Sequence, residues 1–228
     1  MRVACLISGG KDSLYACYVA MHYGWSIDAL IAVKPKKISW MFHYENISLV
    51  PLIAKAMGKN LLIKESEAEK ENELEDLKEL IQKADVEGVI SGAIASEYQR
   101  TRIEKICHEI GVKSFTPLWH KKQEDLLQDL IKAGFEVIIT AVAAEGFGKD
   151  WLGRKIDEKC IEELLEMGIK YGINVAGEGG EFETLVIDCP LYRKKLRIIE
   201  AERKWDGSRG TYEVKRAELM EKNSCKKF

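Results

Sequence analysis

The stretch Ile7-Ser8-Gly9-Gly10-Lys11-Asp12-Ser13 decides how the first half of this chain folds. A short apolar run, residues 2–7, leads into it, and apolar residues at helical spacing follow it: Leu14, Cys17, Tyr18 and Met21. The stretch therefore joins the carboxyl end of a predicted strand to the start of a predicted helix. Backbone N–H groups at a helix N-terminus have no partners inside the helix, and glycines let the chain come close to an anion. We predict a polyphosphate site here.

The side chains of this loop support the same interpretation. A cation such as Lys11 at a helix N-terminus is opposed by the helix dipole by about 0.3–1 kcal/mol unless an anion lies between them. Serine hydroxyls can donate to phosphate oxygens, and Asp12 can cap the helix or ligate a phosphate-bound Mg²⁺. The alternative is a tight glycine turn with a solvated lysine. We predict that the loop binds ATP through Ser8, Gly9, Gly10, Lys11, Asp12 and Ser13, with Lys11 and Asp12 also catalytic and Asp12 a ligand of Mg²⁺.

Around the loop, short apolar runs alternate with helical patterns. We expect strands at residues 2–7, 27–33, 60–63 and 86–91, and helices at residues 12–22, 45–57, 69–83 and 97–110. A βαβα series predicts an α/β fold in which helices flank a parallel sheet, and ligands of such sheets bind beyond the carboxyl ends of the strands. We place this ATP-binding domain at residues 1–120.

The pattern changes after Thr116-Pro117-Leu118-Trp119. We expect helices at residues 123–133 and 156–170, strands at residues 135–142 and 184–188, and a β-hairpin formed by residues 195–204 and 211–218. These elements predict a smaller C-terminal α+β domain at residues 121–228. By its position, this domain is the candidate for substrate docking or self-association.

Two further segments carry candidate site residues. The first, residues 91–104, places a small-residue turn with Gly92 and then a helix start at the same sheet edge as the first loop. Arg100 and Arg102 are candidates to neutralise phosphates, although Arg100 and Glu104, one turn apart, can simply pair on a solvated helix face. The second, Gly177-Glu178-Gly179-Gly180-Glu181-Phe182-Glu183-Thr184, is either a solvated acidic loop or a place that holds a metal, ammonium or a cationic substrate group.

These motifs carry a resemblance. The loop is neither a Walker A motif nor G-x-G-x-x-G, and it resembles the PP-loop of the ATP pyrophosphatases, a Rossmann-like adenine nucleotide alpha hydrolase fold whose signature is S-G-G-x-D-S. Together with S-E-Y-Q-R-T-R-I-E and G-E-G-G-E-F-E-T-L, it makes the whole chain resemble the diphthine–ammonia ligase family. The chain departs from the family pattern at Glu97 and Phe182, where members carry Asp or Tyr.

The resemblance implies a reaction and a set of site residues. It implies a ligase that forms a C–N bond between diphthine on elongation factor 2 and ammonia, through an acyl adenylate and with release of AMP and pyrophosphate. Arg100 and Glu183 would be catalytic, the latter by orienting or deprotonating ammonia, and His43 and Gly92 would border the nucleotide. The substrate would be bound by Tyr98, Gln99, Arg102, Glu104, Glu178, Gly179, Gly180, Glu181 and Thr184. The trimethylammonium group of diphthine favours carboxylates and aromatic faces, so Trp119, Tyr98 and Phe182 are further candidates.

Two other classes of function stay open on the sequence alone. One is another PP-loop adenylating enzyme, acting in tRNA modification or on a small carboxylate. Sulfur transfer is disfavoured because the chain has no C-x-x-C pair, and work on tRNA is disfavoured by the balanced charge. The other is a module that binds ATP without turning it over, which the retained Lys11, Asp12 and acidic loop argue against.

Composition sets limits on partners and location. The 228 residues hold 35 Lys and Arg against 37 Asp and Glu, a formal net charge of −2, so no global positive field attracts nucleic acid. The N-terminal apolar stretch is too short for a signal peptide, and the apolar run at residues 137–144 is too short to span a bilayer. The six cysteines are scattered. We expect a cytoplasmic enzyme with no membrane or nucleic-acid partner.

Overall fold

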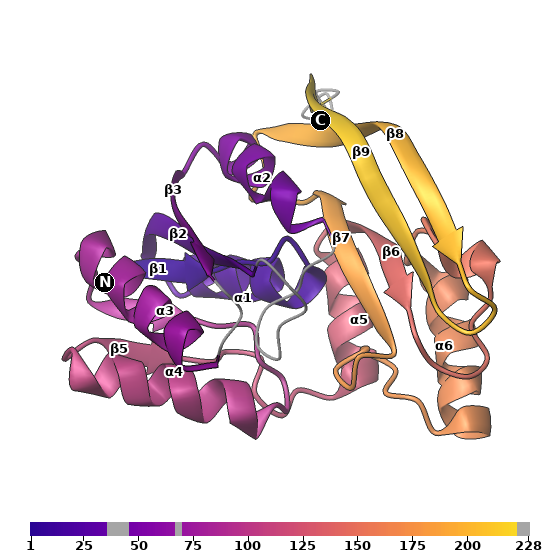
Figure 1. The fold of residues 1–228 in the computed structure, drawn as a ribbon, viewed down its shortest axis with the longest axis horizontal. Coiled ribbons are helices and arrows are strands. Elements are labelled where there is room, and N and C mark those ends of the chain that lie inside the picture. Colours follow the sequence, from indigo (N-terminus) through magenta and orange to yellow (C-terminus); the bar gives the residue numbers. More distant parts are fainter. Residues whose placement is uncertain (36–45, 67–69, 223–228) are drawn as a thin grey trace.

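The computed structural model describes residues 1–35, 46–66 and 70–222. Two sheets make up the architecture: a five-stranded parallel sheet of order β3-β2-β1-β4-β5 and a four-stranded antiparallel sheet of order β7-β6-β9-β8 (Figure 1). The α/β fold with a parallel sheet flanked by helices, followed by a smaller antiparallel part, is therefore confirmed.

The parallel sheet and its helices occupy the first half of the chain. Its strands are β1 (Arg2–Leu6), β2 (Ser26–Pro35), β3 (Asn60–Ser66), β4 (Gly88–Ile90) and β5 (Lys113–Phe115). Its helices are α1 (Lys11–His22), α2 (Val50–Met57), α3 (Lys70–Ala84) and α4 (Glu97–Glu109), with a 3-10 turn, η1 (Ile47–Leu49), before α2. Strand β1 pairs in parallel with β2 on one side and β4 on the other, so the direction of chain progression reverses at β1. Such a reversal is where sheets of this kind bind ligands.

Alternating residues of the parallel sheet enter two hydrophobic layers. Ala4 and Ile31 pack with Leu77 of α3 and Ile103 of α4 on one face. The intervening residues pack with α1 and α2 on the other face, where Val3, Cys5 and Leu30 meet Leu14 and Ile53. This period of two is the strand geometry that the apolar runs predicted.

The second sheet belongs to the C-terminal half. Its strands are β6 (Glu136–Val142), β7 (Phe182–Asp188), β8 (Lys194–Trp205) and β9 (Gly210–Glu221), and its helices are α5 (Gln123–Lys132) and α6 (Glu158–Tyr171), with a 3-10 turn, η2 (Lys149–Trp151). The last two strands form the long hairpin at the right of Figure 1. One continuous apolar core contains residues of both sheets, from Val3 to Val214. The backbone N–H of Val186 in β7 donates to the carbonyl of Gly9, 3.0 Å away, so the second sheet is joined directly to the first loop.

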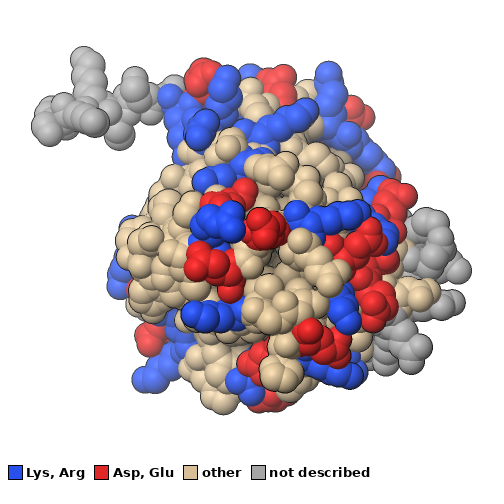
Figure 2. Space-filling model, turned by 90° about the vertical axis from the view of Figure 1, so that its left-hand side faces the viewer, with Lys and Arg blue, Asp and Glu red and all other residues tan. Residues whose placement is uncertain are grey.

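The surface charges are mixed on the side of the parallel sheet that faces the viewer in Figure 2, where basic and acidic side chains are interspersed. Lys78 pairs with Glu109 at 2.7 Å and Lys64 with Asp76 at 2.9 Å. Partly exposed pairs of this kind contribute little stability.

The predicted elements agree with the structure to within a few residues at most ends. The expected helix at residues 45–57 is instead η1 followed by α2, with Pro51 in the first turn of α2; residue 45 lies outside the described residues. Strand β5 was not predicted, because three residues are too short to show a period. The domain division at residue 120 remains a prediction.

Candidate functional site

The first loop and the turn after β4 lie against each other at the point where the sheet reverses. A Cβ atom added at Gly92 would stand 2.6 Å from the backbone nitrogen of Ser13 and 2.8 Å from the carbonyl oxygen of Asp12. These neighbours are backbone atoms, which cannot rotate away. Gly92 is therefore needed for the turn to approach the loop this closely.

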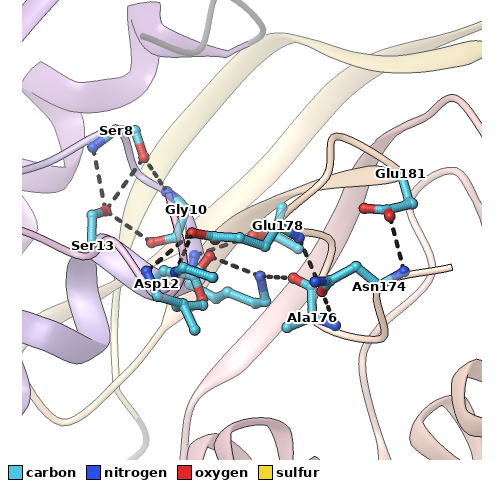
Figure 3. A network of polar contacts seen from close by, with 12 residues as sticks. Ser8, Gly10, Asp12, Ser13, Asn174, Ala176, Glu178 and Glu181 are labelled. Atoms are coloured by element: carbon cyan, nitrogen blue, oxygen red, sulfur yellow. Dashed lines mark hydrogen bonds and ion pairs between the residues drawn. The ribbon is translucent and has the colours of Figure 1, made fainter. Parts of the chain in front are cut away.

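The loop is held by its own serines. The Ser8 hydroxyl accepts from the backbone N–H of Gly10 at 3.3 Å, and the Ser13 hydroxyl donates to the carbonyl of Gly10 at 3.0 Å (Figure 3). Gly9 has a φ of +88°, a conformation that side chains disfavour, and a Cβ there would meet Ile53 at 2.8 Å. Gly10 precedes α1 with no side-chain cap. The start of this 12-residue helix therefore faces the site with its positive dipole end.

Lys11 is buried, with 3% of its surface exposed. Its ammonium donates to Asp12 at 2.8 Å and to the carbonyl of Ala176 at 2.5 Å, and it lies 5.4 Å from the centre of the Phe182 ring. Its backbone N–H donates to the Thr184 hydroxyl at 3.1 Å. Lys11 thus ties the first loop to the segment before β7 as well as placing a charge beside it.

Glu178 ties the acidic loop to the start of α4. One oxygen of its carboxylate accepts hydrogen bonds from three consecutive backbone N–H groups, those of Ile94 and Ala95 at 3.0 Å and of Ser96 at 3.3 Å. Converging N–H groups at a helix start form a favourable site for an anion. In this structure Glu178 supplies that anion.

The other polar groups of the acidic loop shape the loop itself. The Glu181 carboxylate accepts from the backbone N–H groups of Asn174 and Gly179, both at 2.9 Å. The Asn174 side chain accepts from the N–H groups of Ala176 and Glu178 at 3.0 and 3.2 Å (Figure 3). Asn174 was not predicted as a site residue, because nothing in its sequence neighbourhood marks it except the glycines that follow.

These segments enclose a pocket of about 490 Å³. Small-molecule sites in proteins commonly occupy roughly 300–1,000 Å³. Of the predicted site residues, the structure brings these to its lining: Ser8, Gly10, Lys11, Asp12, Ser13, Gly92, Gln99, Glu178, Gly179, Gly180, Phe182, Glu183 and Thr184. An apolar part, formed by Ile31, Ala32, Val33, Ile47 and Leu77, adjoins the carboxyl end of β2.

Four predicted site residues on α4 lie outside this lining. Arg100 pairs with Glu97 at 3.2 Å and Glu104 at 3.6 Å, and its guanidinium lies 4.3 Å from the centre of the Trp119 ring. The Arg102 guanidinium lies 3.4 Å from the centre of the Tyr98 ring. Helix-face pairing, the alternative considered for Arg100 and Glu104, is thus present in this structure.

Three remaining predictions concern His43, a metal and a membrane. His43 lies outside the described residues. Within residues 1–35, 46–66 and 70–222, no group of three or more His, Cys, Asp or Glu side chains could hold a metal ion. In that same part of the chain, no helix combines the length and the apolar character that crossing a membrane requires.

Replacing Glu178 by alanine should release the acidic loop from α4. The N–H groups of Ile94, Ala95 and Ser96 lose their acceptor, so we expect their hydrogen exchange to accelerate at least roughly 10-fold, the size of one lost hydrogen bond to a charged group. Glu178→Gln keeps an acceptor oxygen, so the exchange of these amides should accelerate less than in Glu178→Ala. Unchanged exchange at these three amides in Glu178→Ala would show that Glu178 does not hold the acidic loop against the start of α4.

Comparison with known families and proteins gives one consistent result. A family model described as the diphthamide synthase N-terminal domain matches residues 1–114, and one described as the diphthamide synthase C-terminal domain matches residues 122–220. Several proteins named diphthine–ammonia ligase are similar along most of their length. The protein from Bos taurus is 38% identical, with 89% of this chain and 84% of that protein covered, and the one from Homo sapiens is 37% identical over the same shares. The Danio rerio protein is 37% identical, with 88% and 87% covered.

Among solved structures, a predicted subunit of tRNA methyltransferase from Methanocaldococcus jannaschii matches 80% of this chain and 95% of its own. The TM-score is 0.41 and the sequence identity is 16%. A likeness at this level says nothing about function.

Proposed function

This chain belongs to the diphthine–ammonia ligase family, and on that premise we propose that it joins the carboxylate of diphthine on elongation factor 2 to ammonia while ATP becomes AMP and pyrophosphate. The observation that carries the proposal is the pocket itself. One wall is the S-G-G-K-D-S loop at a helix N-terminus, and the facing wall is the acidic loop with Glu183.

The pocket has features that suit ATP. The start of α1, the glycine backbone and Lys11 would receive the β- and γ-phosphates, where helix dipole and charge favour an anion. The apolar part beside Ile31, Val33 and Leu77 would receive the adenine ring. Asp12 would ligate Mg²⁺ together with phosphate oxygens, since Mg²⁺ at such sites commonly uses only one or two carboxylates. The bound Mg²⁺ would neutralise charge on the phosphates.

The proposed chemistry has two steps. A carboxylate oxygen of diphthine attacks the α-phosphorus of ATP, the bond to the bridging oxygen breaks, and pyrophosphate leaves. Ammonia then attacks the acyl carbon, and AMP leaves with the carboxylate oxygen. Lys11 and the start of α1 stabilise the charge that gathers on pyrophosphate.

We assign to Glu183 the role of orienting ammonia and accepting its proton. It lines the pocket from the start of strand β7, next to Thr184, whose hydroxyl accepts a hydrogen bond from the backbone N–H of Lys11. Of the other two carboxylates of the motif, Glu181 does not line this pocket, and Glu178 lies against the backbone N–H groups before α4. Orienting ammonia and taking its proton are steps that a positioned base commonly accelerates about 10²–10⁴-fold.

The partners and the location are part of the proposal. We propose elongation factor 2 bearing diphthine as the protein substrate, ammonia as the nitrogen donor and the cytoplasm as the location. The five described cysteines are free and buried, in keeping with a compartment where disulfides are rare.

The experiment combines the protein with Mg²⁺-ATP, ammonium and diphthine-bearing elongation factor 2, and follows AMP release and amide formation by mass spectrometry. We expect both products from the wild type, and a loss of amide formation with retained ATP binding from Glu183→Gln. Full activity of Glu183→Gln would remove Glu183 from the mechanism. AMP formation stimulated by tRNA, with no amide, would favour a tRNA-modifying PP-loop enzyme instead.

A further inference from the structure

A second pocket, of about 400 Å³, lies across the antiparallel sheet beside the nucleotide pocket. Both pockets share Gly180 and Glu183 in their linings. Glu183 therefore stands where the two cavities meet, and a group in the second pocket can reach it without passing the loop that would hold ATP.

The strand register shows which residues form the floor of this second pocket. Glu183 of β7 pairs with Ala141 of β6, Ala141 with Thr211 of β9, and Thr211 with Lys204 of β8. Residues directly opposite one another on neighbouring strands point to the same face of a sheet. All four line the second pocket. The pocket thus runs from Glu183 to the outer hairpin strand across three strand spacings, roughly 14 Å.

Small residues along this path leave room for a long side chain. Ala141, Ala143 and Gly180 line the part nearest Glu183, and Ala143 is exposed. At the far end the lining ends in exposed polar residues of the hairpin turn, among them Arg209 and Asp206.

The charges along the path also fit a zwitterionic group. Lys204 is paired with Glu213 at 2.5 Å, and the Asp206 carboxylate accepts from the backbone N–H groups of Ser208 and Arg209 at 2.9 and 2.7 Å. These backbone bonds lower the pKa of Asp206 and keep it ionised. Lys204 and Asp206 are thus neutralised by partners inside the hairpin. Glu183 lies at the inner end, where the two pockets meet, and its negative charge would attract a trimethylammonium group beside the reacting carboxylate.

We propose that the second pocket is the entry path of the protein substrate, in which the modified histidine side chain lies across Ala141 and Thr211 with its zwitterionic end at Glu183. The backbone of the substrate then rests against the turn between β8 and β9. This inference rests on the proposed ligase function. It assigns to the antiparallel sheet the binding of the substrate side chain.

Ala143→Trp tests the path by filling it. The Ala143 backbone N–H donates to the carbonyl of Glu181 at 2.8 Å, a bond that any side chain at this position retains. We expect KM for diphthine-bearing elongation factor 2 to rise roughly 10- to 100-fold, because the indole ring would occupy the space that the substrate side chain needs. The dissociation constant of ATP should stay at the wild-type value, which also shows that the variant is folded.

Glu145→Trp is the matched control, because Glu145 is exposed on the same segment but does not line the pocket. It should leave both constants unchanged. A wild-type KM in Ala143→Trp would overturn the path while leaving the ligase intact. A wild-type protein that makes no amide would overturn the ligase function, and the entry path with it.

Discussion

Lys11→Ala is expected to reduce AMP formation by roughly 10²–10³-fold or more, the usual cost of removing one preorganised group that stabilises transition-state charge. The side chain is 3% exposed, and its ammonium holds both Asp12 and the carbonyl of Ala176. Its removal takes a positive charge from the pocket and leaves two acceptors without this donor. The steady-state rate of AMP release with saturating substrates measures the effect.

Two further variants separate the charge of Lys11 from its contacts. Lys11→Met keeps the apolar stem and should be as inactive as Lys11→Ala, because the charge is what the pyrophosphate needs. Lys59→Ala is the control: this lysine, just before β3, also donates to a backbone carbonyl, that of Ile27 at 2.7 Å, but this contact lies at the amino end of β2, away from the pocket. It should keep normal activity. More than about a tenth of wild-type activity in Lys11→Ala would contradict the role of the loop.

Gly92→Ala is expected to abolish measurable ATP binding at concentrations that saturate the wild type. The new Cβ would stand 2.6 Å from the backbone nitrogen of Ser13 and 2.7 Å from the carbonyl carbon of Asp12, so the turn and the loop must separate. Overpacking of this kind commonly costs about 1–3 kcal/mol of stability, and a displacement of about 1 Å in a catalytic arrangement can cost 10²-fold in rate. Isothermal titration with ATP measures the binding, and a thermal melt measures the stability.

Gly111→Ala serves as the comparison for Gly92. Gly111 has a φ of +72°, so alanine strains the backbone there, but its Cβ would meet nothing within 4 Å. We expect a loss of stability from the strain, about 1–2 kcal/mol, with ATP affinity unchanged. Equal ATP affinities in Gly92→Ala and the wild type would show that the close approach at Gly92 does not position the loop.

The sequence predicted the fold because its signals are local. The apolar runs, the helical spacings and the glycine loop each belong to a short window, and the βαβα order then implies a parallel sheet with its sites at one edge. Strand β5 was not predicted, since Lys113–Phe115 is too short to show an apolar alternation. The order β7-β6-β9-β8 could not be predicted either, because it depends on which strands pair across long stretches of chain.

Part of the pocket lining could be predicted from the motifs, but the contacts of its residues could not. The motifs indicated Lys11, Glu178 and Glu183, and all three line the pocket. No motif shows that Glu178 caps the start of α4, or that Lys11 donates to Ala176, because these partners are 82–84 and 165 residues apart. Arg100 illustrates the opposite case, since its pairing within one helix was readable from spacing and is what the structure shows.

The most direct test of the account follows the oxygen of the carboxylate. Diphthine on elongation factor 2 is labelled with ¹⁸O in its carboxylate and converted with Mg²⁺-ATP and ammonium, and the AMP is then analysed by mass spectrometry. An acyl adenylate predicts AMP that carries one ¹⁸O atom for each amide formed, since the carboxylate oxygen stays on the α-phosphate when ammonia attacks. Amide formed with unlabelled AMP, or with ADP as the nucleotide product, would contradict adenylation by the S-G-G-K-D-S loop.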